Sequence, residues 1–85
     1  MLRVKPKTKI VERKLGREGA MGQWWEESNL IEIDPRHENS KSYLDTCVHE
    51  LLHSAAPQLT ESQVKKIACI ITKGLWGQKF RRIMQ

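Results

Sequence analysis

Residues 41–56 of this chain are KSYLDTCVHELLHSAA. Apolar side chains recur there at intervals of three and four residues, which predicts an amphipathic helix with one broad apolar stripe. The stripe consists of Leu44, Cys47, Val48, Leu51, Leu52 and Ala55. Asn39 or Ser40 can cap the start of this helix, and Pro57 follows its end. We therefore expect a helix over residues 40–56 that packs on the rest of the chain by one face.

The same segment contains a His-Glu-x-x-His motif made by His49, Glu50 and His53. Two histidines four positions apart on a helix project from one face, with Cβ atoms about 5–6 Å apart, so both imidazoles can bind one zinc ion. They lie outside the apolar stripe, on a face that we expect to line a cleft. Glu50 projects about 100° away from His49, where its carboxylate can take a proton from a zinc-activated water. The motif predicts a zinc hydrolase, and a surface helix with two ordinary histidines is the alternative.

A catalytic zinc site normally has three protein ligands, so the motif needs one more. We expect Glu61 to supply it, because Glu61 begins a second predicted helix and the short turn through Pro57 brings it back to the first helix. Glu61 can equally be a carboxylate favoured by the dipole of that helix. His37 lies in a polar loop and is expected to be exposed. Asp34 either orients a metal ligand or forms a turn before Pro35.

The second helix is predicted over residues 60–77. Thr60 and Gln63 have the spacing of a capping box at its start. Its predicted apolar face consists of Val64, Ile67, Ala68, Ile71 and Leu75. Glycines weaken its end, so we expect residues 78–85 to be a frayed basic extension.

Strand-forming residues dominate the segment 1–34. The predicted strands are Leu2–Val4, Thr8–Val11, Met21–Trp25 and Leu30–Asp34. The last of these alternates apolar and acidic residues, as a half-buried strand does. We therefore expect an α+β fold, in which a small antiparallel sheet of three to four strands is followed by two packed helices.

The chain has 85 residues and a net charge of +5, from 15 Lys and Arg against 10 Asp and Glu. This length leaves room for one small domain, residues 1–85, in which a bound metal can supply much of the stability. The basic residues gather at both ends, which favours an anionic partner such as nucleic acid, or forms solvated basic faces. Neither a signal peptide nor a membrane-crossing run is recognisable, so we expect a cytoplasmic protein.

Several other residue types have both a structural and a functional interpretation. Cys47 and Cys69 form no Cys-x-x-Cys pair, so we expect two buried thiols. Tyr43 is a candidate for stabilising an oxyanion, with packing as its alternative role. Three tryptophans in so small a domain build either core or a contact surface. They are Trp24, Trp25 and Trp76.

The run from Leu30 to Glu61, above all its His-Glu-x-x-His motif, resembles the short zincin-type metallopeptidase-like proteins of bacteria and their phages, and the compact gluzincin and SprT-like domains. The resemblance implies a sheet whose edge strand precedes a zinc helix, and an enzyme that hydrolyses peptide bonds. It implies that His49 and His53 bind zinc. It also implies that Glu50 is the general base.

In such proteins we expect acidic residues along the second helix. This chain has Ser62, Lys65, Lys66 and Ile70 at positions where some are expected. Glu61 is then nearly the sole candidate for the third ligand. The strand over Leu30–Ile33 is expected to be an edge strand that can hold an extended peptide by strand addition.

Together these features predict a zinc-dependent peptidase with a peptide or protein substrate, in which Glu50 passes a proton from water to the leaving amine. The alternative is a non-catalytic binding protein, such as a phage-encoded inhibitor or a DNA-associated factor. In that case the metal is structural or absent. The tryptophans and the basic termini would then form the contact surface, and the metal content of the protein separates the two hypotheses.

Overall fold

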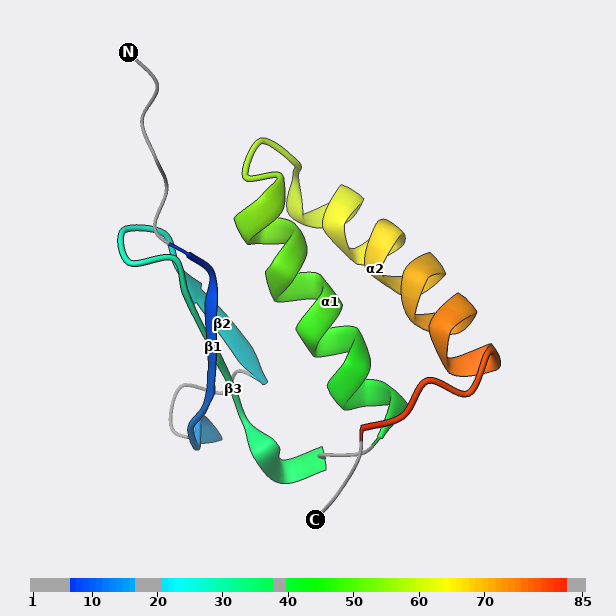
Figure 1. Ribbon diagram of the computed structural model, residues 1–85. Helices are drawn as coiled ribbons and strands as arrows, with labels where there is room; N and C mark the ends of the chain where they lie inside the picture. Colours follow the sequence, from blue (N-terminus) through cyan, green and yellow to red (C-terminus); the bar gives the residue numbers. More distant parts are fainter. Residues whose placement is uncertain (1–6, 17–20, 38–39, 83–85) are drawn as a thin grey trace.

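The computed structural model describes residues 7–16, 21–37 and 40–82. Three strands are followed by a short 3-10 helix and two α-helices. Their bounds are β1 Lys9–Glu12, β2 Gly22–Trp25, β3 Leu30–Ile33, η2 Pro35–His37, α1 Lys41–Ala55 and α2 Glu61–Gly77. Figure 1 shows the sheet, α1 and α2 as three successive layers, with α1 in the middle. The predicted α+β order of a small sheet and two packed helices is confirmed.

Two further sequence predictions concern an N-terminal strand and membrane-spanning helices. The predicted strand over Leu2–Val4 lies outside the described residues. Neither α1 nor α2 combines the length and the apolar composition that crossing a bilayer requires, and no other helix does so in the part of the chain that the structure describes.

The sheet has the strand order β1-β3-β2. β2 and β3 form an antiparallel hairpin, in which Trp24 lies opposite Ile31. β1 pairs with the other edge of β3 in parallel, with Ile10 also opposite Ile31. The sheet is therefore mixed, whereas the sequence predicted an antiparallel one. Because the chain reverses direction twice between β1 and β3, these two strands run the same way, and β1 takes the outer edge of β3 and not that of β2.

β3 is the central strand, so the expectation that Leu30–Ile33 forms an edge strand is wrong. Both of its edges already have hydrogen-bonded partners, and no added peptide can pair there. Ile31 and Ile33 are fully buried, on the face that α1 covers. The edges of the sheet are β1 and β2. Of these two, β2 makes the larger contact with α1.

A buried polar cluster joins the hairpin turn to α1. Asn29 in the turn has a φ of 50°, in the left-handed region that asparagine tolerates better than most residues. Its Oδ1 accepts hydrogen bonds from the Ser54 hydroxyl at 2.6 Å and from the Trp24 indole at 3.0 Å. Its Nδ2 donates to the Thr8 hydroxyl at 2.9 Å. Because Ser54 directly follows His53 on α1, this cluster positions the end of the helix that carries the motif.

Both helices begin where the capping pattern predicted. The Ser40 hydroxyl accepts a hydrogen bond from the Tyr43 backbone N–H at 3.0 Å, so Ser40 caps α1. Asn39, the other candidate cap, lies outside the described residues. Thr60 and Gln63 form the predicted capping box at the start of α2. These reciprocal bonds satisfy backbone N–H groups that a helix start leaves without partners.

The core is small and includes polar residues of α1. Among the described residues, the fully buried apolar side chains are Leu15, Ile31, Ile33, Val64 and Ala68. The most buried residues of α1 are Glu50 and Ser54, whereas Leu51 in the predicted apolar stripe is 38% exposed. The expectation of two buried thiols is wrong: Cys69 is exposed, and Cys47 is only half-buried. Burial still raises the pKa of the Cys47 thiol to about 11.

The chain after α2 is anchored as far as it is described. Arg82 forms a salt bridge with Glu12 of β1 at 2.5 Å, and the Tyr43 hydroxyl donates to the same carboxylate at 2.6 Å. The Arg81 guanidinium lies 3.4 Å from the centroid of the Trp76 ring. The predicted frayed extension is therefore wrong at Arg82, because its pairing with Glu12, far along the chain, holds this residue in place. Residues 83–85 lie outside the described residues.

β2 passes very close to α1 at Gly22. A Cβ atom on Gly22 would lie 2.6 Å from Thr46 Cγ2 and 3.0 Å from Glu50 Cγ. We expect Gly22→Ala to lower the free energy of unfolding by about 1–3 kcal/mol, because the two layers must move apart. Urea denaturation measures this change.

Two further variants test the cause of that change. Gly16→Ala is the matched control, because no atom lies within 4 Å of the added methyl group. Thr46→Ser removes the closest methyl, so it should recover part of the loss in the Gly22→Ala background. Equal stability of the two alanine variants would contradict this packing.

The opposite face of the sheet carries a buried carboxylate. Glu32 is 8% exposed; it accepts a hydrogen bond from Arg13 Nε at 2.7 Å and another from the Trp25 indole at 2.8 Å. These two bonds, that from Arg13 foremost, hold the pKa of Glu32 below its usual value of 4.5. Glu32 therefore stabilises the fold above pH 4.5, and this contribution is lost as the pH falls through the lowered pKa.

We accordingly expect Glu32→Gln to destabilise the protein at pH 7 by on the order of 1 kcal/mol, because Arg13 is half-exposed and solvent weakens the pair. The difference from the parent protein should shrink as the pH falls below 4.5. Urea denaturation at pH 7, 5 and 3.5 measures it. The exposed Glu27 gives the control variant Glu27→Gln, whose difference should stay near zero; a difference for Glu32→Gln that does not change with pH would refute the assignment.

Candidate metal centre

His49, His53 and Glu61 converge at the end of the α1–α2 pair where the short turn joins the two helices. His49 Nε2 lies 2.6 Å from Glu61 Oε1, and His53 Nε2 lies 3.2 Å from Glu61 Oε2. The two imidazole centroids are 4.9 Å apart. One donor atom from each of the three residues lies within 4.8 Å of the others. Two imidazole nitrogens and a carboxylate oxygen at this spacing can hold a metal ion.

The turn between the helices places Glu61. α1 ends at Ala55, and the backbone N–H of Leu59 donates to the Ala56 carbonyl at 3.0 Å in the tight connection. α2 then runs back along α1, so its first residue meets the last two turns of the motif helix. The expected return of Glu61 to the motif is confirmed. Its place in the first turn of α2 also suits a carboxylate on dipole grounds, so the two interpretations are compatible.

The cluster is accessible from one side. The side chains of His49 and His53 are 18% and 21% exposed, whereas that of Glu61 is 58% exposed. The histidines are therefore held by their surroundings, and the carboxylate faces solvent. An ion bound by these three residues could still be reached by water or by a further ligand.

Glu50 lies on the sheet side of the cluster. It is 8% exposed, and Gly22 of β2 faces its side chain. Burial raises the pKa of Glu50 above its usual value, and the neighbouring His49 and His53 partly counteract this rise. A carboxylate with increased proton affinity beside two imidazoles can accept and release a proton.

Trp24 forms one wall beside His53. Their rings are stacked, with centroids 6.3 Å apart and an interplanar angle of 6°. The indole N–H is bonded to Asn29, which fixes the ring plane. The sequence placed Trp24 only among core or contact tryptophans. A signal was present, because Gly22 and Trp24 are two positions apart on β2 and so share the face that meets α1.

Three other residues considered from the sequence stand apart from the cluster. The Tyr43 hydroxyl donates to Glu12, and burial together with this carboxylate raises the pKa of Tyr43 to about 12, so its proposed oxyanion role is wrong. Asp34 accepts from the backbone N–H groups of Leu15 at 2.7 Å and Arg36 at 3.0 Å, so it organises loops and orients no metal ligand. The backbone of His37 lies in η2, and its side chain lies outside the described part of the structure.

Comparison of the chain with protein-family models, with curated proteins and with solved structures gives no match in any of the three. The interpretation of the site therefore depends on its donor atoms and their surroundings.

The geometry predicts that each chain binds one divalent metal ion. Bound metal should raise the unfolding temperature. At a free metal concentration of a hundred times Kd, the free energy of unfolding should rise by about 2.7 kcal/mol. His53→Ala and Glu61→Ala should each weaken binding at least about tenfold, because loss of even an outer-sphere partner has this effect. Calorimetric titration of metal-free protein measures the affinity.

The control for charge is Glu26→Ala, an exposed carboxylate on the hairpin turn, which should bind metal like the parent protein. Unchanged affinity in both the His53→Ala and Glu61→Ala variants would refute this site.

Proposed function

We propose that this protein is a zinc-dependent hydrolase of peptide bonds, of the zincin type. The observation that carries the proposal is the convergence of His49, His53 and Glu61, whose donor atoms lie within 4.8 Å of one another, next to the buried Glu50. Two histidines and one glutamate form the ligand set of several catalytic zinc sites. The exposure of Glu61 leaves room for a fourth ligand from solvent or substrate.

The donor set favours zinc over calcium and magnesium. Imidazole nitrogen suits zinc, whereas calcium and magnesium prefer sites built from oxygen alone. The described residues offer no thiolate at this cluster, which argues against a closed structural site rich in cysteine. Zinc bound here would supply a Lewis acid that acidifies water and polarises a carbonyl group.

Glu50 is suited to the proton transfers of amide hydrolysis. Its carboxylate takes a proton from the attacking water and delivers it to the leaving amine nitrogen. Burial increases its proton affinity, so that it can hold the proton between the two steps. The tight approach of β2 at Gly22 keeps this side chain beside the cluster.

The edge strand β2 supports a peptide as the substrate. Among the described residues β2 pairs only with β3, so its outer edge offers backbone N–H and C=O groups. An extended peptide can add to such an edge as a further strand. Because Trp24 of β2 stacks on His53, a peptide on this edge would run beside the metal ligands. β2 thus takes the role that the sequence assigned to Leu30–Ile33.

The test is the variant Glu50→Gln, which keeps the shape of the side chain and removes its basicity. We expect it to fold and to bind zinc while its peptidase activity falls by about 10²–10⁴-fold. Cleavage of a peptide library of random sequence by the zinc-loaded protein, read by mass spectrometry, measures activity whatever sequence the enzyme prefers. Chelation of the metal should abolish cleavage by the parent protein.

Full activity of a folded, zinc-loaded Glu50→Gln protein would refute the role of this residue. Tight zinc binding with no cleavage of any library peptide would instead favour the alternative of a non-catalytic metal protein. The control is Glu27→Gln, an exposed position on the hairpin turn, which should retain full activity.

A further inference from the structure

A groove between α1 and α2 continues from the metal centre. It is lined by two rows of side chains that face each other, one on each helix, and within each row the residues are four positions apart. On α1 the stripe consists of His53, His49, Asp45 and Lys41, and on α2 it consists of Glu61, Lys65, Cys69 and Lys73. The groove encloses about 470 Å³ and begins at His49.

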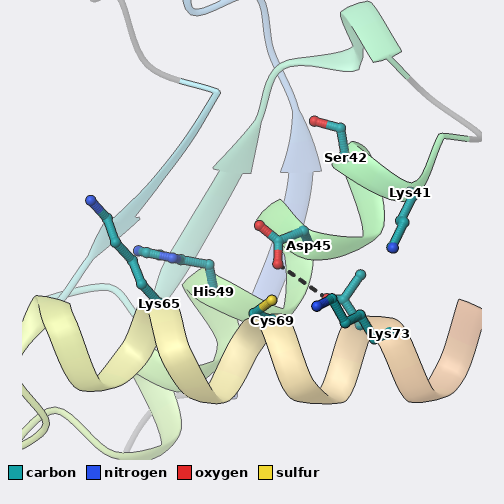
Figure 2. A pocket seen from close by; sticks show the side chains of 8 residues that line it. Lys41, Ser42, Asp45, His49, Lys65, Cys69 and Lys73 are labelled. Atoms are coloured by element: carbon teal, nitrogen blue, oxygen red, sulfur yellow. Dashed lines mark hydrogen bonds between the residues drawn. The ribbon is translucent and has the colours of Figure 1, made fainter.

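The groove is positively charged. Three lysines and one aspartate line it. Figure 2 shows Lys65 beside His49 at one end, and Lys41 and Lys73 at the other. Among the described residues none of these lysines forms a salt bridge within the protein. Their charges are therefore available to an anionic ligand.

The single acidic residue in the groove is held against the wall. Asp45 Oδ1 accepts a hydrogen bond from the Thr72 hydroxyl at 3.2 Å, as drawn in Figure 2. It neutralises part of the lysine charge in the middle of the groove. The two ends, at Lys65 and at the pair of Lys41 and Lys73, remain the most positive parts.

We propose that this groove binds acidic side chains of the substrate peptide, on one side of the bond that is cut. The proposal rests on the proposed peptidase function and adds a substrate class to it. Lys65 and Lys73 are two helical turns apart, about 12 Å along α2. An extended peptide covers that distance with three to four residues. The preferred substrate therefore carries Asp or Glu within about four residues of the cleaved bond.

The lining favours a peptide over a nucleic acid. It contains neither arginine nor an aromatic ring apart from His49, so bases have no platform for stacking. A groove of about 470 Å³ is too small for a duplex but accommodates a few side chains. A continuous row of phosphates would meet the Asp45 carboxylate in the middle of the groove. A peptide can place acidic side chains at the two ends only, and its backbone N–H groups can donate to Asp45.

The experiment measures peptide binding with the zinc-loaded Glu50→Gln protein, which binds without cutting. Two fluorescent peptides of equal length and sequence differ only in four Asp or Glu residues, which the second peptide carries as Asn or Gln. We expect the acidic peptide to bind at least about tenfold more tightly in 50 mM salt, and less so in 300 mM salt, because the lysines are exposed.

Lysine variants locate the binding. The double variant Lys65→Gln with Lys73→Gln should remove most of the preference for the acidic peptide. Lys66→Gln is the matched control, because Lys66 is exposed on the same helix and does not line the groove. It should retain the preference.

Cys69 provides a readout that needs neither zinc nor catalysis. It lines the groove and is exposed, whereas Cys47 is half-buried with a raised thiol pKa of about 11. Iodoacetamide should therefore alkylate Cys69 first, and the acidic peptide should slow this reaction at least about threefold in metal-free protein, while the amide peptide should not.

The outcomes separate the two proposals. Protection of Cys69 by the acidic peptide, together with no hydrolysis of this peptide or of the peptide library by the zinc-loaded parent protein, supports the groove and refutes the peptidase. Hydrolysis with equal binding of both peptides refutes the groove alone. Tighter binding of a single-stranded oligonucleotide than of the acidic peptide, lost in the double lysine variant, would overturn the proposal and make the groove a nucleic-acid site.

Discussion

The molecule depends on the close approach of β2 to α1. Gly22 leaves no space for a methyl group between strand and helix, so Glu50 is enclosed on the sheet side of the motif helix. Two residues further along β2, Trp24 stacks on His53, and the hydrogen bonds of Asn29 hold both Trp24 and Ser54. The contact between β2 and α1 therefore determines how deeply the Glu50 carboxylate is buried and how the His53 imidazole is oriented. The environment of the candidate metal centre therefore depends on this packing, and α1 alone sets only the direction of its side chains.

Features governed by local rules could be predicted from the sequence. The start of α1 at Ser40 and that of α2 at Thr60 follow from capping chemistry, which involves only neighbouring residues. The spacing of the motif fixes both histidines on one face, and the short turn after Ala56 returns Glu61 to them. The three candidate ligands are therefore close in sequence as well as in space, because one helical hairpin supplies all of them.

Features governed by contacts across the sheet could not be predicted in the same way. The pairing of β1 with β3 depends on which edge of the hairpin is free, and strand patterns do not encode this choice. The apolar stripe of α1 indicated one buried face, but a helix between two layers also buries a polar face, here Glu50 and Ser54. The anchoring of Arg82 by Glu12 joins residues from opposite ends of the described chain. Tyr43 belongs to that network, which is why a role for it at the cluster was wrong.

The anchoring of α2 at both ends has a mechanical consequence. α2 packs mainly on α1, and a helix with one neighbour could swing away from it. Here the cluster around Glu61 joins its first turn to α1, and the chain just beyond its last turn is tied to β1 through Arg82. Both ends of α2 are thus tied to the rest of the fold, which opposes movement of α2 away from α1. Binding costs less entropy when the site is already formed than when the ligand must order it, so a groove between two tied helices lets weak individual charges discriminate between ligands.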